Sequence, residues 1–400
     1  KETGAAIVYG PTAQPDFEAI IGEDNQLFEL GDVKIKLLHT PGHTLESSCF
    51  LLIDENGNET ALFSGDTLFL GDVGRPDLAQ KAANMTQDQL AGLLYDSLYT
   101  KILPLNDDII VYPAHGAGSA CGKNMMKETV DTLGNQKQMN YALNQPNKES
   151  FIKAVTDGLL KPPAYFAMNV AMNKKGYKNF DNVLKSALTP IAAVDFEAQA
   201  EQTGALILDT RSDKEFTKGF VPQSINIGLN GDFAPWVGAL IIDVNQPILL
   251  VTEKGKEEET ITRLSRVGFD NVIGYLDGGF ESWANANQEV DQVNRITAEQ
   301  FSKDFYDNSK VIDVRKESEF NAEHVESAEN LPLADINEWI HSINPNEHFY
   351  LHCAGGYRSM IAASILQARG YRNFTEVEGG FNAISLTNIP KTNYVCQSKS

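Results

Sequence analysis

The sequence predicts an α/β protein of several domains, chiefly because of its length and an internal repeat. Its 400 residues, 42% hydrophobic and 22% charged, are too many for one ordinary core. In the second half, "LILDTRSDKEF" at 206–216 matches "KVIDVRKESEF" at 310–320, and "GFDNVIGYLDGGFESW" at 268–283 matches "GYRNFTEVEGGFNAI" at 370–384. Each copy alternates β-rich runs with helical stretches over about 100 residues, which predicts a mainly parallel sheet.

Charge and hydropathy argue against a nucleic-acid-binding protein and against a membrane protein. The formal net charge of −21 argues against nonspecific binding to nucleic acid or to an anionic membrane. No apolar run reaches the roughly 18 residues that span a bilayer, and no signal peptide is evident, so we expect a cytoplasmic protein with no membrane partner. The cysteines are too few for a disulfide framework, and we expect reduced thiols at Cys49, Cys121, Cys353 and Cys396.

The segment "HCAGGYRS" at 352–359 follows the apolar run Phe349–Leu351 and precedes a helix-like stretch. Ligand-binding loops lie at the carboxyl ends of parallel strands. Backbone N–H groups in such a loop, together with a helix N-terminus, favour an anion or a thiolate. We therefore predict an active loop with Cys353 and Arg358 as catalytic residues and an anion-binding surface made by Ala354, Gly355, Gly356, Tyr357 and Ser359.

The two copies resemble rhodanese domains, with an Asp-x-Arg after the second strand and a Gly-Gly-aromatic turn near the end. The resemblance implies structural ion pairs at Asp313/Arg315 and Asp209/Arg211. Tyrosine phosphatase loops place five residues between Cys and Arg, whereas four separate Cys353 from Arg358, a smaller cradle that suits a persulfide sulfur. Cys353 is thus predicted to carry a sulfane sulfur. The alternative is a buried structural thiol.

The first copy lacks this chemistry. Its corresponding loop, "VTEKGKEEE" at 251–259, has glutamates and no cysteine, so it offers no nucleophile and repels sulfur oxyanions. We predict an inactive domain at residues 191–290, serving packing or interface roles, and an active domain at residues 294–396.

Three strands in the first part of the chain end near potential metal ligands. "LLHTPGHTLESSCFLL" at 37–52 contains His43, "ETALFSGDTLF" at 59–69 contains Asp66, and "DIIVYPAHGAGS" at 108–119 contains His115. Two imidazoles and a carboxylate that converge at one sheet edge suit a transition metal.

This pattern resembles the metallo-β-lactamase superfamily. Residues 1–176 would be the C-terminal part of its αββα sandwich, joined by a linker at 177–190 to the repeats. The superfamily's leading THxHxDH motif is not in this sequence, and the chain starts at Lys1 with a strand-like "GAAIVYG". We therefore expect that an N-terminal segment has been omitted. The run "SGDTLFLGDVGRPDL", with "YPAHGAGSACG" and "KPPAYFAMN", further resembles persulfide dioxygenases of the ethylmalonic-encephalopathy type.

That resemblance implies one mononuclear Fe(II) held by two histidines and one aspartate. His43 and Asp66 would be two ligands, with the third histidine upstream. His115 lies where binuclear relatives bind a second metal, and we expect it near the site as an unligated or supporting residue.

Three further residues are candidates for the pocket. Arg75 and Asp77 either shape it or form a loop salt bridge. Cys121 either lies beside the substrate sulfur or is a packed thiol.

The implied reaction oxidises a low-molecular-weight persulfide, of the glutathione, coenzyme A or bacillithiol type, with O2 to sulfite. Sulfite would then accept the sulfur on Cys353 and give thiosulfate. Two alternatives stay open: a zinc-dependent thioester hydrolase of the glyoxalase II type with a rhodanese tail, and a non-catalytic scaffold. A symmetric homo-oligomer is expected.

Overall fold

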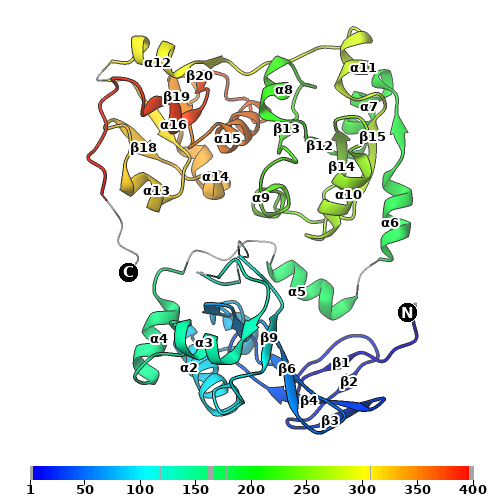
Figure 1. Cartoon of the computed structure of the whole chain (residues 1–400). Helices are drawn as coiled ribbons and strands as arrows, with labels where there is room; N and C mark the ends of the chain where they lie inside the picture. The colour runs from blue at the N-terminus through cyan, green and yellow to red at the C-terminus, as the bar shows by residue number, and fades with distance from the viewer. Residues whose placement is uncertain are drawn as a thin grey trace. The chain divides into compact units, whose positions relative to one another are not determined.

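The computed structural model describes residues 3–117, 119, 121–123, 125–159, 166–176, 178–306 and 308–395. The chain divides into two compact units, Lys1–Phe166 with Val170–Gly176, and Ala167–Asn169 with Tyr177–Ser400 (Figure 1). Cys396 and residues 161–165 of the "KPPAYFAMN" run lie outside the described residues. Among the described helices, none combines the length and apolar character needed to cross a bilayer.

The first unit is built on a six-stranded sheet of order β10-β9-β6-β5-β4-β3. Neighbouring strands are antiparallel except β6 and β9, which are parallel. The strands are β3 Leu27–Leu30, β4 Val33–His39, β5 Ser48–Ile53, β6 Glu59–Gly65, β9 Ile110–Pro113 and β10 Asp131–Thr132. Two small pairs accompany them, β1 Val8–Tyr9 with β2 Ile20–Ile21, and β7 Leu68–Phe69 with β8 Asp72–Val73.

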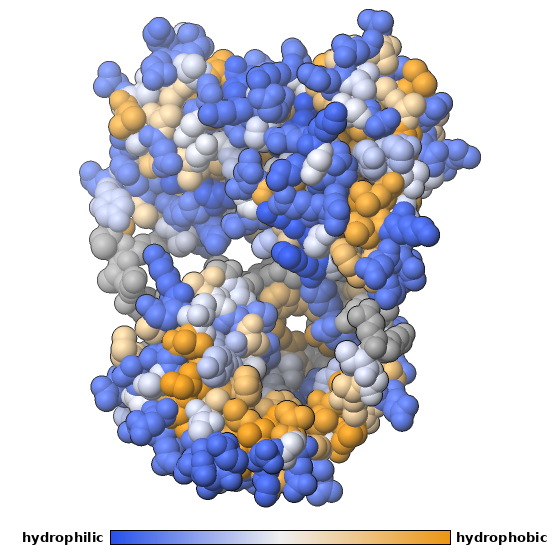
Figure 2. Space-filling model, turned by 45° about the vertical axis from the view of Figure 1, so that its right-hand side comes forward, coloured by the Kyte–Doolittle hydropathy of each residue, from blue (hydrophilic) through white to orange (hydrophobic). Residues whose placement is uncertain are grey.

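Alternation along these strands separates two faces of the sheet. One face, which includes Cys49, Leu51 and Leu62, belongs to the buried core beneath the helices. The other face carries Phe63 and Tyr112, whose rings stack 5.5 Å apart while remaining exposed. Figure 2 shows apolar side chains at the surface of this unit. The described residues thus supply one sheet and one helical layer of the αββα sandwich.

The helices of this unit are mostly short. They are α1 Gln80–Ala83, α2 Gln87–Ser97, the π-helical η1 Leu98–Ile102, α3 Leu133–Met139 and α4 Lys148–Thr156. Residues Phe166–Lys175 form α5. Helix α2 begins at a capping box, in which the Thr86 side chain accepts from Gln89 N and the Gln89 side chain accepts from Thr86 N.

The second unit contains two five-stranded parallel sheets with the same topology, β11-β15-β14-β12-β13 and β16-β20-β19-β17-β18. The predicted repeat of mainly parallel α/β folds is therefore confirmed. The strands are β11 Pro190–Ile191, β12 Leu206–Asp209, β13 Ile225–Asn226, β14 Ile248–Val251 and β15 Val272–Leu276, then β16 Arg295–Ile296, β17 Val311–Asp313, β18 Ala328–Asn330, β19 Phe349–His352 and β20 Phe374–Val377.

Helices flank both sheets (Figure 1). In the first repeat they are α7 Ala193–Thr203, α8 Asp213–Lys218, α9 Phe233–Leu240, α10 Glu257–Ser265 and α11 Gly279–Asn285. In the second they are α12 Ala298–Asp304, α13 Glu317–Ala322, the 3-10 helices η2 Leu333–Asp335 and η3 Ile340–Ser342, α14 Ile336–Trp339, α15 Tyr357–Ala368 and α16 Gly380–Ile384. The segment predicted as a linker contains α6, Phe180–Ala187, which packs on β15 and α10.

The Asp-x-Arg motif has the same structure in both repeats. Asp209 and Arg211 form a buried ion pair at 2.6 Å, as do Asp313 and Arg315. Each guanidinium lies over the phenylalanine of the Gly-Gly-Phe turn, at 4.3 Å from the ring centroid in the first repeat and 4.2 Å in the second. The predicted ion pairs are confirmed, and their presence in the repeat that has no cysteine supports a structural role.

Candidate functional site

The first candidate site lies at one edge of the six-stranded sheet. Because β4, β6 and β9 run in the same direction, their carboxyl ends meet at that edge, and the predicted ligands follow those ends. His43 Nε2 is 3.4 Å from Asp66 Oδ2, and His115 Nε2 is 3.4 Å from Asp66 Oδ1. Each carboxylate oxygen of Asp66 therefore faces a different imidazole.

His43 is held in one orientation by the backbone. Its Nδ1 lies 2.9 Å from the Arg75 carbonyl oxygen, which can only accept a hydrogen bond. Nδ1 must then carry a proton, and Nε2 is the ring nitrogen that faces Asp66 and could ligate a metal. Metal-ligating histidines are commonly fixed in this way by a carbonyl behind the ring.

Asp66 has a free acceptor position suited to a metal. Its Oδ1 is buried and accepts no hydrogen bond from any described residue, although His115 Nε2 is near it. Burial opposes ionisation of the carboxyl, but the hydrogen bond and charge of His43 and the charge of His115 hold its pKa below the usual value. A carboxylate that faces two imidazole nitrogens and has one unsatisfied oxygen fits a divalent transition metal.

The loop after β8 holds this edge together. Arg75 and Asp77 form a two-pronged ion pair, with Nε–Oδ1 at 2.7 Å and Nη2–Oδ2 at 2.8 Å, which confirms the loop salt bridge. The preceding residue, Gly74, packs directly on the backbone of Asp66, where an added Cβ would lie 1.8 Å from the carbonyl oxygen. The sequence offered "GRPD" as a family resemblance only; the close approach that requires glycine was missed.

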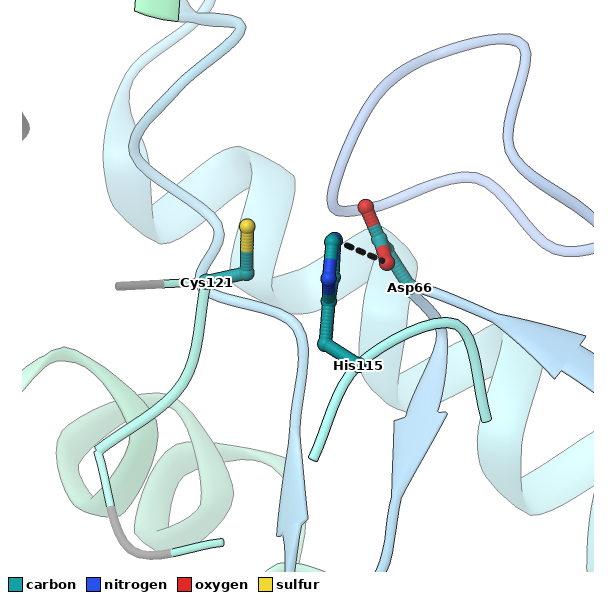
Figure 3. A group of neighbouring side chains, drawn as sticks. All are labelled: Asp66, His115 and Cys121. Carbon is teal, nitrogen blue, oxygen red and sulfur yellow. Dashed lines mark ion pairs between the residues drawn. The ribbon is translucent and has the colours of Figure 1, made fainter. Parts of the chain in front are cut away.

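Cys121 completes a cluster with Asp66 and His115 (Figure 3). One ligand atom from each of these residues lies within 4.8 Å of the others. The backbone positions the thiol, since Arg75 N donates to the Cys121 carbonyl at 3.1 Å. Burial and the charge of Asp66 raise the pKa of the thiol, which favours its neutral form in this environment.

The second candidate site is the loop after β19. Cys353 is buried, and its Sγ accepts a hydrogen bond from Gly356 N at 3.1 Å. The Ser359 hydroxyl lies 3.4 Å from the same sulfur. Gly356 has φ 108°, a conformation that favours glycine, and α15 begins at the next residue. The thiol therefore lies at the N-terminus of a 12-residue helix.

The Gly-Gly-Phe turn supports this loop from behind. Phe381 N donates to the Cys353 carbonyl at 2.6 Å, and Asn382 N donates to the Ala354 carbonyl at 2.9 Å. A Cβ on Gly380 would lie 2.3 Å from the Cys353 carbonyl oxygen. The turn thus engages the carbonyls of Cys353 and Ala354, while Gly356 N donates to the sulfur. Sequence analysis used the turn only as a mark of the family.

Four of the predicted loop residues differ in what they contact. Gly356 and Ser359 contact the thiol, whereas Tyr357 and Arg358 are engaged elsewhere. Arg358 forms a two-pronged ion pair with Glu319 at 2.6 and 2.8 Å, so an anion would share or displace that carboxylate. The Tyr357 hydroxyl donates to Gly228 O of the first repeat at 2.8 Å.

The corresponding loop of the first repeat has a threonine in place of the cysteine, and a glutamate side chain hydrogen-bonds to its backbone. The buried Thr252 follows β14 at the position of Cys353. Gly255 N donates to Glu257 Oε1 at 3.2 Å, and α10 begins with three glutamates. A carboxylate of the chain itself thus takes a loop N–H that would otherwise be free for an anion.

We predict that Gly74→Ala weakens metal binding about 10- to 100-fold, because its methyl group must push the Asp66 backbone away from His43. Metal content after dialysis against buffered iron or zinc measures the effect. Gly92→Ala is the matched control, since its Cβ meets the flexible end of Lys148 at 3.1 Å and Ile152 Cδ1 at an ordinary contact distance of 3.9 Å. Equal metal content in wild type and Gly74→Ala would contradict the assignment.

We also predict that Thr252→Cys, made in a Cys353→Ser chain, gives no sulfurtransferase activity. The new thiol would lie in a loop whose own glutamates repel sulfur oxyanions. Thiosulfate-dependent formation of thiocyanate from cyanide measures turnover. Activity above that of Cys353→Ser alone would show that the first repeat lacks only a nucleophile.

Known proteins resemble both parts of the chain. The family description "Rhodanese-like domain" matches residues 192–286 and 297–387. The crystal structure of a metallo-beta-lactamase from Staphylococcus aureus subsp. aureus COL aligns with a TM-score of 0.59 and 29% identity, covering 68% of this chain and 78% of that one.

Two curated relatives match shorter stretches. Hydroxyacylglutathione hydrolase GloC of Haemophilus influenzae is 32% identical over 122 residues, 30% of this chain and 46% of its own length. The hydroxyacylglutathione hydrolase of Francisella tularensis subsp. novicida is 39% identical over 111 residues, 28% of this chain and 39% of its own length. The chain thus spans less than half of these relatives. It is an α/β protein in which a metallo-β-lactamase-like N-terminal region is followed by two rhodanese-like domains.

Proposed function

We propose that this chain is a persulfide dioxygenase coupled to a sulfurtransferase. The N-terminal region would oxidise a low-molecular-weight persulfide to sulfite, and the second rhodanese-like domain would transfer sulfane sulfur through Cys353 to give thiosulfate. The observation that carries the sulfurtransferase is the Cys353 loop, in which Gly356 N–H and the Ser359 hydroxyl both face the thiol sulfur. The dioxygenase is supported by the imidazole and carboxylate donors at Asp66 and by the resemblance.

The metal-binding residues would be His43 and Asp66, with His115 as a further nitrogen donor at the same carboxylate. The donor set of imidazole and carboxylate suits a mononuclear Fe(II), with zinc as the alternative. Bound Fe(II) would supply activation of dioxygen next to a thiolate-type substrate. The chain's own contribution is orientation: the Arg75 carbonyl fixes the His43 ring, and Gly74 lets Asp66 come close.

The oxidation balances with water as a reactant. A persulfide, dioxygen and water give a thiol and sulfite, with release of two protons. The sulfane sulfur is oxidised, dioxygen is reduced, and the carrier thiol leaves with its own sulfur unchanged.

Sulfur transfer needs a second persulfide and no oxidant. The Cys353 thiolate attacks the outer sulfur of the persulfide, and the carrier thiolate leaves. Sulfite then attacks the outer sulfur on Cys353, which releases thiosulfate and regenerates the thiolate. Arg358, near the loop but paired with Glu319, would offset the charge of the incoming sulfite. Covalent linkage of two domains that share an intermediate raises its effective concentration at the second site.

One observation favours a second candidate function. Because each oxygen of Asp66 faces a different imidazole, His43, Asp66 and His115 could hold zinc in a hydrolase, where the metal would activate water. The hydroxyacylglutathione hydrolases that match this region act, by their names, on acylated glutathione. A zinc-dependent thioester hydrolase would use the same residues without consuming oxygen.

Oxygen uptake separates the two candidates. The full-length, iron-loaded protein is given glutathione persulfide, and oxygen, sulfite and thiosulfate are measured for wild type and Cys353→Ser. We expect uptake in both proteins, with the product shifting from thiosulfate to sulfite in the variant because the sulfur carrier is lost.

Asp66→Asn is the matched control, since it removes a ligand charge and should abolish uptake while Cys353 still accepts sulfur. Uptake that is absent in an iron-loaded wild type would contradict the dioxygenase. Thiosulfate formation that is unchanged in Cys353→Ser would contradict the sulfurtransferase step.

A further inference from the structure

Helix α15, which follows the Cys353 loop, is buried on all sides. Every residue from 359 to 367 is buried, whereas a helix at a surface normally exposes one face. Its own repeat covers part of it through β19 and β20, and β13 of the first repeat packs against it as well. Asn226 N of that strand donates to Ser364 Oγ at 2.9 Å. The first repeat therefore forms part of the environment of the active loop.

Tyr357 enters the first repeat directly from the loop. Its hydroxyl donates to Gly228 O at 2.8 Å, and its ring lies against Gly231. A Cβ on Gly231 would lie 2.3 Å from Tyr357 Cζ, so the ring fills space that only glycine leaves open. Burial and nearby Asp232 raise the pKa of Tyr357, which keeps the hydroxyl a neutral donor.

A second connection runs from the half-buried pair Asp213 and Arg295 to the buried Glu376. Asp213, the first residue of α8 in the first repeat, lies 3.2 Å from Arg295 Nη2, and Arg295 Nε donates to Glu376 Oε2 at 2.6 Å. Glu376 is fully buried, and its Oε1 accepts from the Ser359 hydroxyl at 2.6 Å. Ser359 Oγ in turn lies 3.4 Å from Cys353 Sγ.

Both connections end at the two residues that face the sulfur. Gly356 lies directly before Tyr357, and a Cβ placed on it would be 3.6 Å from Asp213 Oδ2 and 3.7 Å from Arg295 Nη2. A loop with two consecutive glycines, Gly355 and Gly356, has high conformational freedom. Contacts with residues outside this loop must therefore fix the position of its backbone at the thiol.

We propose that the first repeat, which has no nucleophile of its own, positions the Cys353 loop for sulfur transfer. It holds Tyr357 in the Gly228–Gly231 cradle and Arg295 through Asp213, and these positioning residues keep Gly356 N–H and Ser359 directed at the sulfur. The inference rests on the proposed role of Cys353 as sulfur carrier and is independent of the dioxygenase reaction.

A double-mutant cycle tests the Tyr357 connection. Gly231→Ala should slow sulfur loading of Cys353 about 10- to 100-fold, since small displacements of a reacting group have effects of that size. In a Tyr357→Ala chain, Gly231→Ala should cause no further loss, because the ring through which it acts is absent. Tyr357→Phe keeps the ring and removes only the hydrogen bond to Gly228, so it should show a smaller loss.

A pair of charge substitutions on α8 tests the second connection. Asp213→Asn should slow loading, because Arg295 then has only Glu376 as a charged partner. Glu215→Gln is the matched control on the same helix, since Glu215 pairs with Lys218 at the surface, 2.5 Å away. We expect loading by Glu215→Gln to equal that of wild type.

The full-length protein is mixed with glutathione persulfide, and the Cys353 peptide is followed by mass for the gain of one sulfur atom. Loading rates are measured at limiting and at saturating concentrations of glutathione persulfide. A variant that only binds the donor more weakly should reach the wild-type rate at saturation, whereas a variant with a mispositioned loop should remain slow. Circular dichroism identifies variants that do not fold. If Gly231→Ala or Tyr357→Ala does not fold, the milder variants Tyr357→Phe and Asp213→Asn test the proposal instead.

Two results would overturn the proposal. One is a folded Gly231→Ala chain that loads sulfur as fast as wild type. The other is an equal loss from Gly231→Ala with and without the Tyr357 ring. A wild type that loads no sulfur would instead overturn the proposed role of Cys353. In that case the positioning claim would be tested by measuring the rate at which iodoacetamide alkylates Cys353 in the same set of Gly231 and Tyr357 variants.

Discussion

The direction of the β-strands is the constraint on which both candidate sites depend. In the N-terminal region, β4, β6 and β9 run in the same direction, so residues far apart in sequence, His43, Asp66 and His115, arrive at one edge of the sheet. In the second repeat, the parallel strands place the loop of Cys353 at the carboxyl edge, where a helix N-terminus can face the thiol. In both cases backbone groups then set the orientation of the reactive side chain.

Comparison of the two rhodanese-like repeats distinguishes features that the fold requires from features that the chemistry requires. The ion pair of the Asp-x-Arg motif and its contact with phenylalanine are kept in both repeats, so they belong to the fold. The loops differ: in one repeat the N–H of Gly356 donates to a thiol, and in the other the N–H of Gly255 donates to the carboxylate of Glu257. The first repeat, whose loop has no cysteine, offers a surface against which α15 packs and to which Tyr357 donates a hydrogen bond.

The sequence predicts much of the architecture and places the candidate site residues just after strand ends, because strand ends and repeated motifs are local signals. It does not predict contacts that form only after folding. Glu376 lies in a short strand and Arg295 at the start of another, and nothing local indicates that they meet Ser359. The direction of Tyr357, toward the first repeat, depends on packing between repeats. His115 was expected near the site by resemblance, and the geometry brings it to the second oxygen of Asp66, a contact that the sequence does not specify.

The fate of isotopically labelled dioxygen tests the central claim most directly. The iron-loaded full-length chain would be given glutathione persulfide under heavy-isotope dioxygen, and the thiosulfate formed would be analysed by mass. The account predicts that oxygen atoms from dioxygen appear on the oxidised sulfur of thiosulfate, with the remaining oxygen supplied by water. Thiosulfate or sulfite free of the label, or release of thiol without oxygen consumption, would contradict the dioxygenase and leave a hydrolase joined to a sulfurtransferase.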